Sequence, residues 1–197
     1  MEFFGYPLWT VCLICLGVFC ASFIDAIGGG GGIISVPCYL LAGIPVHYTL
    51  GTNKLSACIG TVASTVRYVK NGCVDWLLAA PSIVLAMVGA HLGTRLQLTV
   101  DERYLKLLLL VVLPVIAVVL LKKKDLPEER KPMQEGFRRG IAWGYSLAVG
   151  VYDGFYGPGT GTFLIIAFTI FAKLNISSAN AQAKVINLTT NITSLII

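Results

Sequence analysis

The long apolar runs of this chain constrain its fold more than any other feature. They cover residues 8–24, 76–92, 105–121 and 163–171. The longest of these runs approach the roughly 20 residues that a helix needs to cross a bilayer. Across the chain 56% of residues are hydrophobic and 13% are charged, against about 25% charged in a typical soluble domain. The sequence therefore predicts an all-α fold, a polytopic transmembrane helical bundle.

Seven of the fifteen basic residues lie in one polar segment, residues 122–139, with the sequence KKKDLPEERKPMQEGFRR. Short loops rich in lysine and arginine lie on the cytoplasmic side of a membrane. We therefore interpret the net charge of +5 as a sign of orientation, and nucleic-acid binding is not predicted. The first residues carry an acid and no base before the apolar run, which favours a retained helix over a secretory signal.

Other chemistry has little support in the sequence. The six cysteines lie mostly in apolar or small-residue runs, where cysteine usually serves as a small hydrophobe. Cys12 and Cys15 form a C-x-x-C, but neither a second such pair nor a suitable histidine pair accompanies it. The Gly-rich segments lack the Lys-Ser/Thr of a phosphate-binding loop, and no Ser/His/Asp constellation is visible. We expect no metal, no cofactor and no enzymatic activity.

Two windows of the chain resemble each other. FIDAIGGGGGIISVP begins at residue 23 and VYDGFYGPGTGTFL begins at residue 151. Each continues through a short apolar run and a polar connector to a lysine that opens a predicted helix. Duplication with helices interrupted at equivalent places is typical of secondary transporters. The paired positions are Asp25 and Asp153, Gly29 and Gly157, Gly31 and Gly159, and, after a two-residue adjustment, Lys54 and Lys184.

This duplication predicts two internal repeats with glycine-interrupted helices. Residues 1–121 form the first transmembrane repeat, residues 122–139 the basic cytoplasmic loop, and residues 140–197 the second transmembrane repeat. The second repeat lacks counterparts of the two helices that follow Gly72, and the chain stops within a helical pattern. We therefore expect the sequence to be truncated at its C-terminus.

The glycine breaks, residues 28–32 and 157–161, predict a site in the interior of the bundle. Non-helical backbone at membrane depth is tolerated only when it is buried in protein or lines a wet cavity. A helix that starts after such a break directs free N–H groups and its positive dipole end into the site, and these groups suit an anion. Close helix packing through glycine is the alternative.

Buried charges accompany the breaks. Asp25 and Asp153 are the acids that lie well inside apolar surroundings, and Lys54 and Lys184 begin helices with a polar face. Ionisable groups inside a membrane are costly and indicate function. Desolvation favours the neutral form of a carboxyl group, so either aspartate is a candidate for carrying a coupling proton. A structural Asp–Lys pair, or Asp25 acting as a helix cap, is the alternative.

At these motifs the chain resembles the TauE/SafE family, also called the toluene sulfonate uptake permease family. The resemblance rests on FIDAIGGGGGIISVP, LGTNKLSAC, YDGFYGPGTGTFL and ANAQAKVINLTTNI, and the second repeat is most similar to the YfcA-like branch. It implies a duplicated multi-helix transporter of the bacterial inner membrane that moves sulfite, sulfoacetate, sulfonates and related organic anions. Pro158 and Thr160 replace glycines of the first break, so the half-sites are not expected to be equivalent.

We predict a secondary transporter of small sulfur-containing or carboxylate anions, coupled to protons. A passive anion channel with the same lining and a non-transporting membrane partner or sensor subunit are the alternatives. The expected partners are a small anionic substrate and the lipid bilayer, with a homo-oligomer left open. The predicted substrate-binding residues are Gly29, Gly30, Gly31, Thr52, Asn53, Lys54, Gly157, Gly159, Thr160, Lys184, Asn187 and Asn191, and the predicted proton-coupling residues are Asp25 and Asp153.

Overall fold

The computed structural model describes residues 2–3, 6–122 and 133–197, and helices account for most of them. The predicted all-helical fold is confirmed. Two short strands, β1 (Glu2–Phe3) and β2 (Tyr6–Pro7), pair antiparallel before the first helix. The helices of the described residues are α1 (Leu8–Gly28), α2 (Gly32–Leu41), α3 (Val46–Lys70), α4 (Trp76–Thr99), α5 (Glu102–Lys122), α6 (Glu135–Phe155), α7 (Thr160–Ile170) and α8 (Ile176–Ile196).

Three helices begin earlier than the sequence predicts. Helix α3 begins directly after Pro45, since the side chains of Val46 and Leu50 are buried and hold its first turns in place. Helix α8 begins after Asn175, whose side chain accepts a hydrogen bond from the Ser178 N–H at 2.7 Å. Lys54 and Lys184 therefore lie in the third turns of their helices, and the prediction that each lysine opens a helix is wrong.

Helix α6 begins at Glu135, within the segment predicted to be a loop. The carboxylate of Glu135 lies 3.7 Å from Arg138 and 3.1 Å from Arg139, across the first turns of the helix. Such pairs at spacings of three and four residues support a helix. Of the predicted loop 122–139, residues 123–132 lie outside the described residues.

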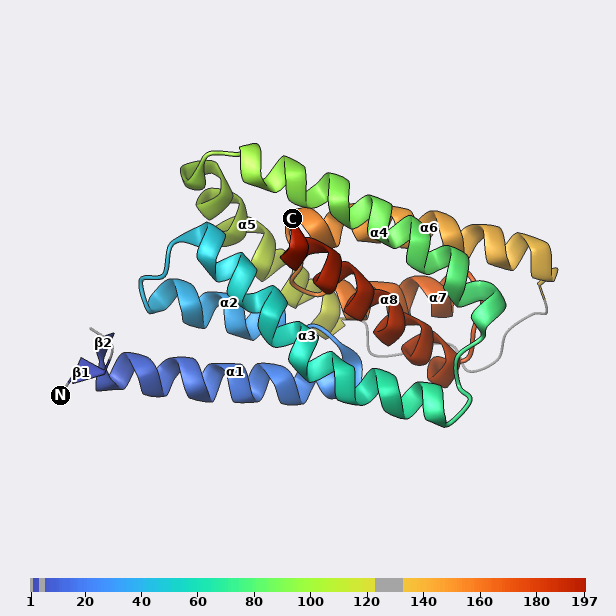
Figure 1. Cartoon of the computed structure of the whole chain (residues 1–197), viewed down its shortest axis with the longest axis horizontal. Helices are drawn as coiled ribbons and strands as arrows, with labels where there is room; N and C mark the ends of the chain where they lie inside the picture. Colours follow the sequence, from blue (N-terminus) through green and yellow to red (C-terminus); the bar gives the residue numbers. More distant parts are fainter. Residues whose placement is uncertain (1, 4–5, 123–132) are drawn as a thin grey trace.

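The helices form a bundle in which α3 and α8 cross the middle (Figure 1). Helix α1 runs along one edge, while α4 and α6 lie side by side along the opposite edge. One apolar cluster around Leu164 and Phe168 joins α7 to α4, α6 and α8. A second, around Leu105 and Leu109, joins α5 to α2, α3 and α6. Both clusters flank the place where α1 meets α7.

The outer surface and helix lengths fit a membrane. Among the described residues, α1 and α4 are long and apolar enough to cross a bilayer. Phe19 and Phe23 of α1 are 70% and 64% exposed, and extended apolar surface of this kind calls for an apolar surrounding. Helix α2 has 10 residues and α7 has 11. At about 1.5 Å of rise per residue, each reaches about halfway across the hydrocarbon core.

Candidate functional site

The chain reverses between α1 and α2 at its first glycine break. Gly29 and Gly30 have φ values of 78° and 91°, a region that favours glycine because it has no Cβ. Asp25 lies in the last turn of α1, and its Oδ1 accepts a hydrogen bond from the Gly31 N–H at 3.3 Å. Gly31 is the residue before α2. The carboxylate therefore lies at the positive end of this short helix.

The second break, between α6 and α7, has the same parts. Gly157 and Gly159 have φ values of 91° and 88°, and Asp153 lies in the last turn of α6. Thr160, the first residue of α7, donates its hydroxyl hydrogen bond to Asp153 Oδ1 at 2.6 Å. Each break thus places an aspartate against the start of a half-length helix.

The two breaks touch backbone to backbone. A Cβ added at Gly29 would lie 2.8 Å from the backbone of Gly161, and one added at Gly161 would lie 3.0 Å from Gly29 Cα. The Thr162 hydroxyl donates to the Gly28 carbonyl at 3.2 Å across the same contact. The end of α1 and the start of α7 therefore meet at one point, where an added side chain would clash with backbone.

Two buried ion pairs join the part of the chain before residue 123 to the part after residue 132; we call these two parts the halves of the molecule. Lys54 of α3 lies with its Nζ 2.9 Å from Asp153 Oδ1, and Lys184 of α8 lies with its Nζ 3.6 Å from Asp25 Oδ2. Each ammonium group also donates to the backbone carbonyl of its partner aspartate. The lysine and aspartate side chains are between 1% and 12% exposed. Buried charges require such partners, so the pairs tie the two halves together.

A small polar cavity lies beside the two ion pairs, at a place that we call the crossing. Its volume is about 20 Å³, which is enough for one water molecule. Both aspartates line it, together with the amide side chains of Asn53, Asn187 and Asn191. It is a water-sized space surrounded by hydrogen-bonding groups.

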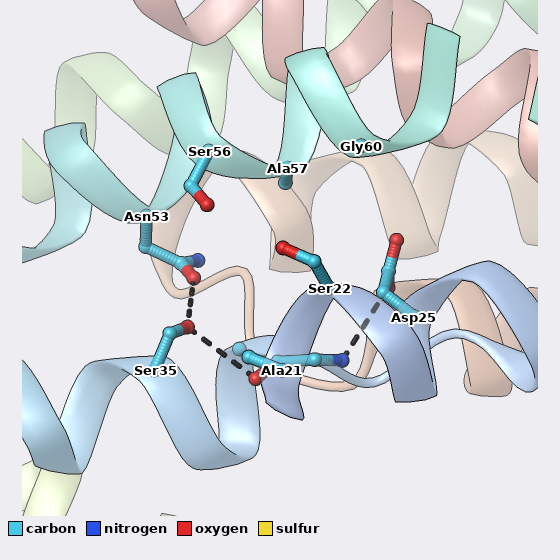
Figure 2. Close-up of a pocket in the computed structure, with 10 residues that line it drawn as sticks. Ala21, Ser22, Asp25, Ser35, Asn53, Ser56, Ala57 and Gly60 are labelled. Carbon is cyan, nitrogen blue, oxygen red and sulfur yellow. Dashed lines mark hydrogen bonds between the residues drawn. The ribbon is translucent and has the colours of Figure 1, made fainter. Parts of the chain in front are cut away.

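A second cavity of about 20 Å³ adjoins the first between α1, α2 and α3, and Figure 2 shows its lining. The Ser35 hydroxyl donates to Asn53 Oδ1 at 2.6 Å within it. The Thr61 hydroxyl donates to Asp25 Oδ2 at 3.3 Å. Asp25 and Asn53 line both cavities, so polar space continues from the crossing toward the outer part of α3.

Most of the predicted site residues come together. Lys54 and Lys184 lie beside the central cavity as partners of the aspartates, while Gly29 and Gly31 form the break itself. Thr52 does not join them, because its side chain is exposed away from the site. The predicted residues that line the central cavity are Gly30, Asn53, Gly157, Gly159, Thr160, Asn187, Asn191, Asp25 and Asp153.

The sequence did not single out three residues of this region. Ser35 orients Asn53, Gly32 lines both cavities, and Gly161 contacts the backbone of Gly29. Gly32 and Gly161 lay within the predicted breaks, so their position in a glycine-rich break was the usable signal. Ser35 carried none, since a lone serine in an apolar helix is common.

These features define an integral membrane protein of the transporter class. The chain belongs to the sulfite exporter TauE/SafE family, which it matches over residues 14–197. The family resemblance carried by its motifs is thus confirmed, and the protein is a membrane transporter that handles a small-molecule substrate.

Similar proteins carry names that agree with this class. A probable membrane transporter protein of Haemophilus influenzae is 36% identical over 92% of this chain and 71% of its own length. The probable membrane transporter protein YfcA of Escherichia coli K12 is 34% identical over 100% of this chain and 74% of its own length. A Sinorhizobium relative, ORF9, is 34% identical over 90% of this chain and 67% of its own. No solved structure shows a significant match.

Proposed function

We propose that the protein is a proton-coupled secondary transporter of small anions, namely sulfite, sulfonates and related sulfur-containing or carboxylate organic anions. It would act in the bacterial inner membrane as a multi-pass protein, with residues 122–139 on the cytoplasmic side. One observation carries the proposal: two half-length helices begin at the same polar cavity, and a buried lysine is paired with each of the two aspartates that line it. Helix starts and lysines both favour anions.

We further propose that residues 1–121 and 140–197 are internal repeats of opposite orientation. Helices α1 and α6 both have 21 residues, and each lysine is the ninth residue of its helix. Helices α3 and α8 run in opposite directions (Figure 1), and Leu50 near the start of α3 lines one cavity with Ser194 near the end of α8. Inverted repeats around a central site support alternating access.

The protein's own carboxylates occupy the anion positions in this structure. Asp25 accepts from the Gly31 N–H, and Asp153 accepts from Thr160 and Lys54. A sulfite ion is larger than the one water that the central cavity holds. Transport therefore requires the two breaks to separate and a substrate anion to replace a carboxylate beside a lysine.

Uptake by reconstituted protein tests this function. The paired variant Lys54→Met with Asp153→Leu removes both charges together, so neither partner is left buried alone. We expect uptake of radiolabelled sulfite, driven by a pH gradient, to fall about tenfold or more while the protein stays folded. Ile59→Ala, on the exposed face of the same helix, is the matched control. Full uptake by the paired variant would show that Lys54 does not bind the substrate.

The same vesicles separate the alternatives. Accumulation of sulfite or sulfoacetate above the external concentration is expected of a coupled transporter. Flux that stops at equal concentrations would indicate a passive channel. Absence of both binding and flux would indicate the non-transporting partner or sensor.

A further inference from the structure

We infer that Asp153, and not Asp25, carries the coupling proton, that Oδ2 is the atom that receives it, and that this protonation releases Lys54 for the substrate anion. The inference rests on the proposed function and adds the identity of the proton site. It comes from a difference between two aspartates at equivalent places.

Asp25 has partners for both carboxylate oxygens. Its Oδ1 accepts from the Gly31 N–H at 3.3 Å. Its Oδ2 accepts from the Thr61 hydroxyl at 3.3 Å and lies 3.6 Å from Lys184 Nζ. Its side chain is 12% exposed. A carboxylate with donors at both oxygens is stabilised in its charged form, which favours a fixed role for Asp25 at the start of α2.

Asp153 is arranged differently. Its side chain is 1% exposed. Both of its close polar contacts are made by Oδ1, which lies 2.6 Å from the Thr160 hydroxyl and 2.9 Å from Lys54 Nζ. Oδ2 is buried and has no hydrogen-bond partner among the described residues. A buried carboxylate oxygen without a donor is unfavourable. A proton on Oδ2 turns it into a donor, and Asp153 lines the cavity where one water can accept.

The charges around Asp153 determine how its protonation changes the net charge of the site. The four charged groups of the crossing, two aspartates and two lysines, sum to zero. A proton on Oδ2 leaves Lys54 with an uncompensated charge, and one negative charge on a bound anion restores neutrality. The site therefore exchanges one proton for one negative charge of the substrate in each cycle. The titratable groups that surround Asp153 are Lys54 and Cys58 on α3, Asp25 on α1, Lys184 on α8, Tyr152 on α6, and Tyr156 directly after α6.

Three neighbouring spaces with shared lining residues lie between the surface and this site. The central cavity shares Asp25 and Asn53 with the cavity of Figure 2. That cavity in turn shares Gly60 with a groove of about 530 Å³ that includes Ser64 and Arg67. Arg67 is exposed, so the groove reaches the surface. Water in these spaces gives a proton a path to Asp153 along one face of α3.

Infrared spectroscopy of the purified full chain in lipid nanodiscs tests the proton site without any substrate. A pH titration is expected to show a protonated-carboxyl C=O band. Asp153→Asn removes this band, and Asp25→Asn, the matched control, keeps it. Loss of the band in Asp25→Asn, its persistence in Asp153→Asn, or its absence from the unaltered protein overturns the inference. The paired variant Lys54→Gln with Asp153→Asn gives the same readout if Asp153→Asn alone does not fold.

Proteoliposomes that contain a pH-sensitive dye test the coupling, with sulfite as the probe. We expect the ratio of protons to sulfite to fall about tenfold or more in Asp153→Asn and to be unchanged in the flux that Asp25→Asn retains. An unchanged ratio in Asp153→Asn contradicts the inference. A carboxyl band lost only in Asp153→Asn, with no sulfite flux in the unaltered protein, would keep the proton site and refute the proposed function.

Discussion

Glycine brings helices together in two regions of this protein, and the two regions differ. Along the α4–α6 contact, a Cβ added at Gly93 would lie 2.1 Å from the Val151 carbonyl oxygen, and one at Gly154 would lie 2.2 Å from that of Ala90. These glycines have ordinary helical backbones. At the centre, a Cβ added at Gly29 would lie 2.8 Å from Gly161, but Gly29 has a φ of 78° and lies beside two buried ion pairs.

The difference separates two uses of glycine that the sequence left as alternatives. In α4 and α6, Ala86 lies against Gly150 and Ala90 against Gly154, which is the small-residue packing common between membrane helices. At the centre, the glycines lie between two helices and line a polar cavity. Close approach alone therefore does not distinguish the two regions, whereas positive φ and neighbouring buried charge do.

The largest effect is expected from breaking a buried pair at the centre. Asp153→Ala leaves Lys54 buried without its carboxylate, which costs about 3–5 kcal/mol of stability. Unfolding of the purified protein by titration with a denaturing detergent measures the loss. The paired variant Lys54→Met with Asp153→Leu, which buries no charge there, is expected to recover most of it. Equal losses in the single and paired variants would show that the ion pair itself is not the cause.

A smaller loss is expected at the α4–α6 contact. Gly93→Ala places a methyl group against the α6 backbone, and overpacking of this kind costs about 1–3 kcal/mol. Gly144→Ala, on α6 but with nothing within 4 Å of the new Cβ, is the control and is expected to be neutral or stabilising. The same unfolding titration compares them. If the transport rate per folded molecule also falls in Gly93→Ala, this contact is more than packing.

Gly29→Ala should cost less stability but more transport. The new side chain meets the Gly161 backbone and adopts a positive φ, with strain of about 1–2 kcal/mol. Gly28→Ala, one residue earlier with open space around its Cβ, is the control. Sulfite uptake normalised to folded protein is expected to fall in Gly29→Ala alone. Similar uptake in both variants would argue that the contact of the two breaks plays no part in transport.

The sequence predicted the helices well because apolar runs and glycine breaks are local features. It misplaced the start of α3, because residues 46–51 include β-branched side chains and a glycine, which are weak helix formers. Burial of Val46 and Leu50 against other helices decides that start. Tertiary contacts of this kind leave no local signal.

The site was predicted in part for a similar reason. Thr52, Asn53 and Lys54 are consecutive, and successive residues of a helix point about 100° apart, so all three cannot face the same centre. The fold turns Asn53 and Lys54 inward and leaves Thr52 exposed. The crossed pairing of Lys54 with Asp153 was equally out of reach, because it depends on how the two halves are placed against each other.

The smallest effect is expected from removing the Ser35 hydroxyl, which tests whether the polar groups at the centre act on the substrate. Ser35 donates to Asn53 Oδ1 at 2.6 Å and so fixes which way that amide faces the cavity. Ser35→Ala is expected to cost about 1 kcal/mol of folding stability and, separately, to raise the KM for sulfite by at most about fivefold, the change that corresponds to about 1 kcal/mol of lost binding energy. Ser22→Ala, in the same cavity but without a hydrogen bond to the other residues drawn in Figure 2, is the control. A loss of stability with an unchanged KM would assign Ser35 to packing and would remove Asn53 from substrate binding.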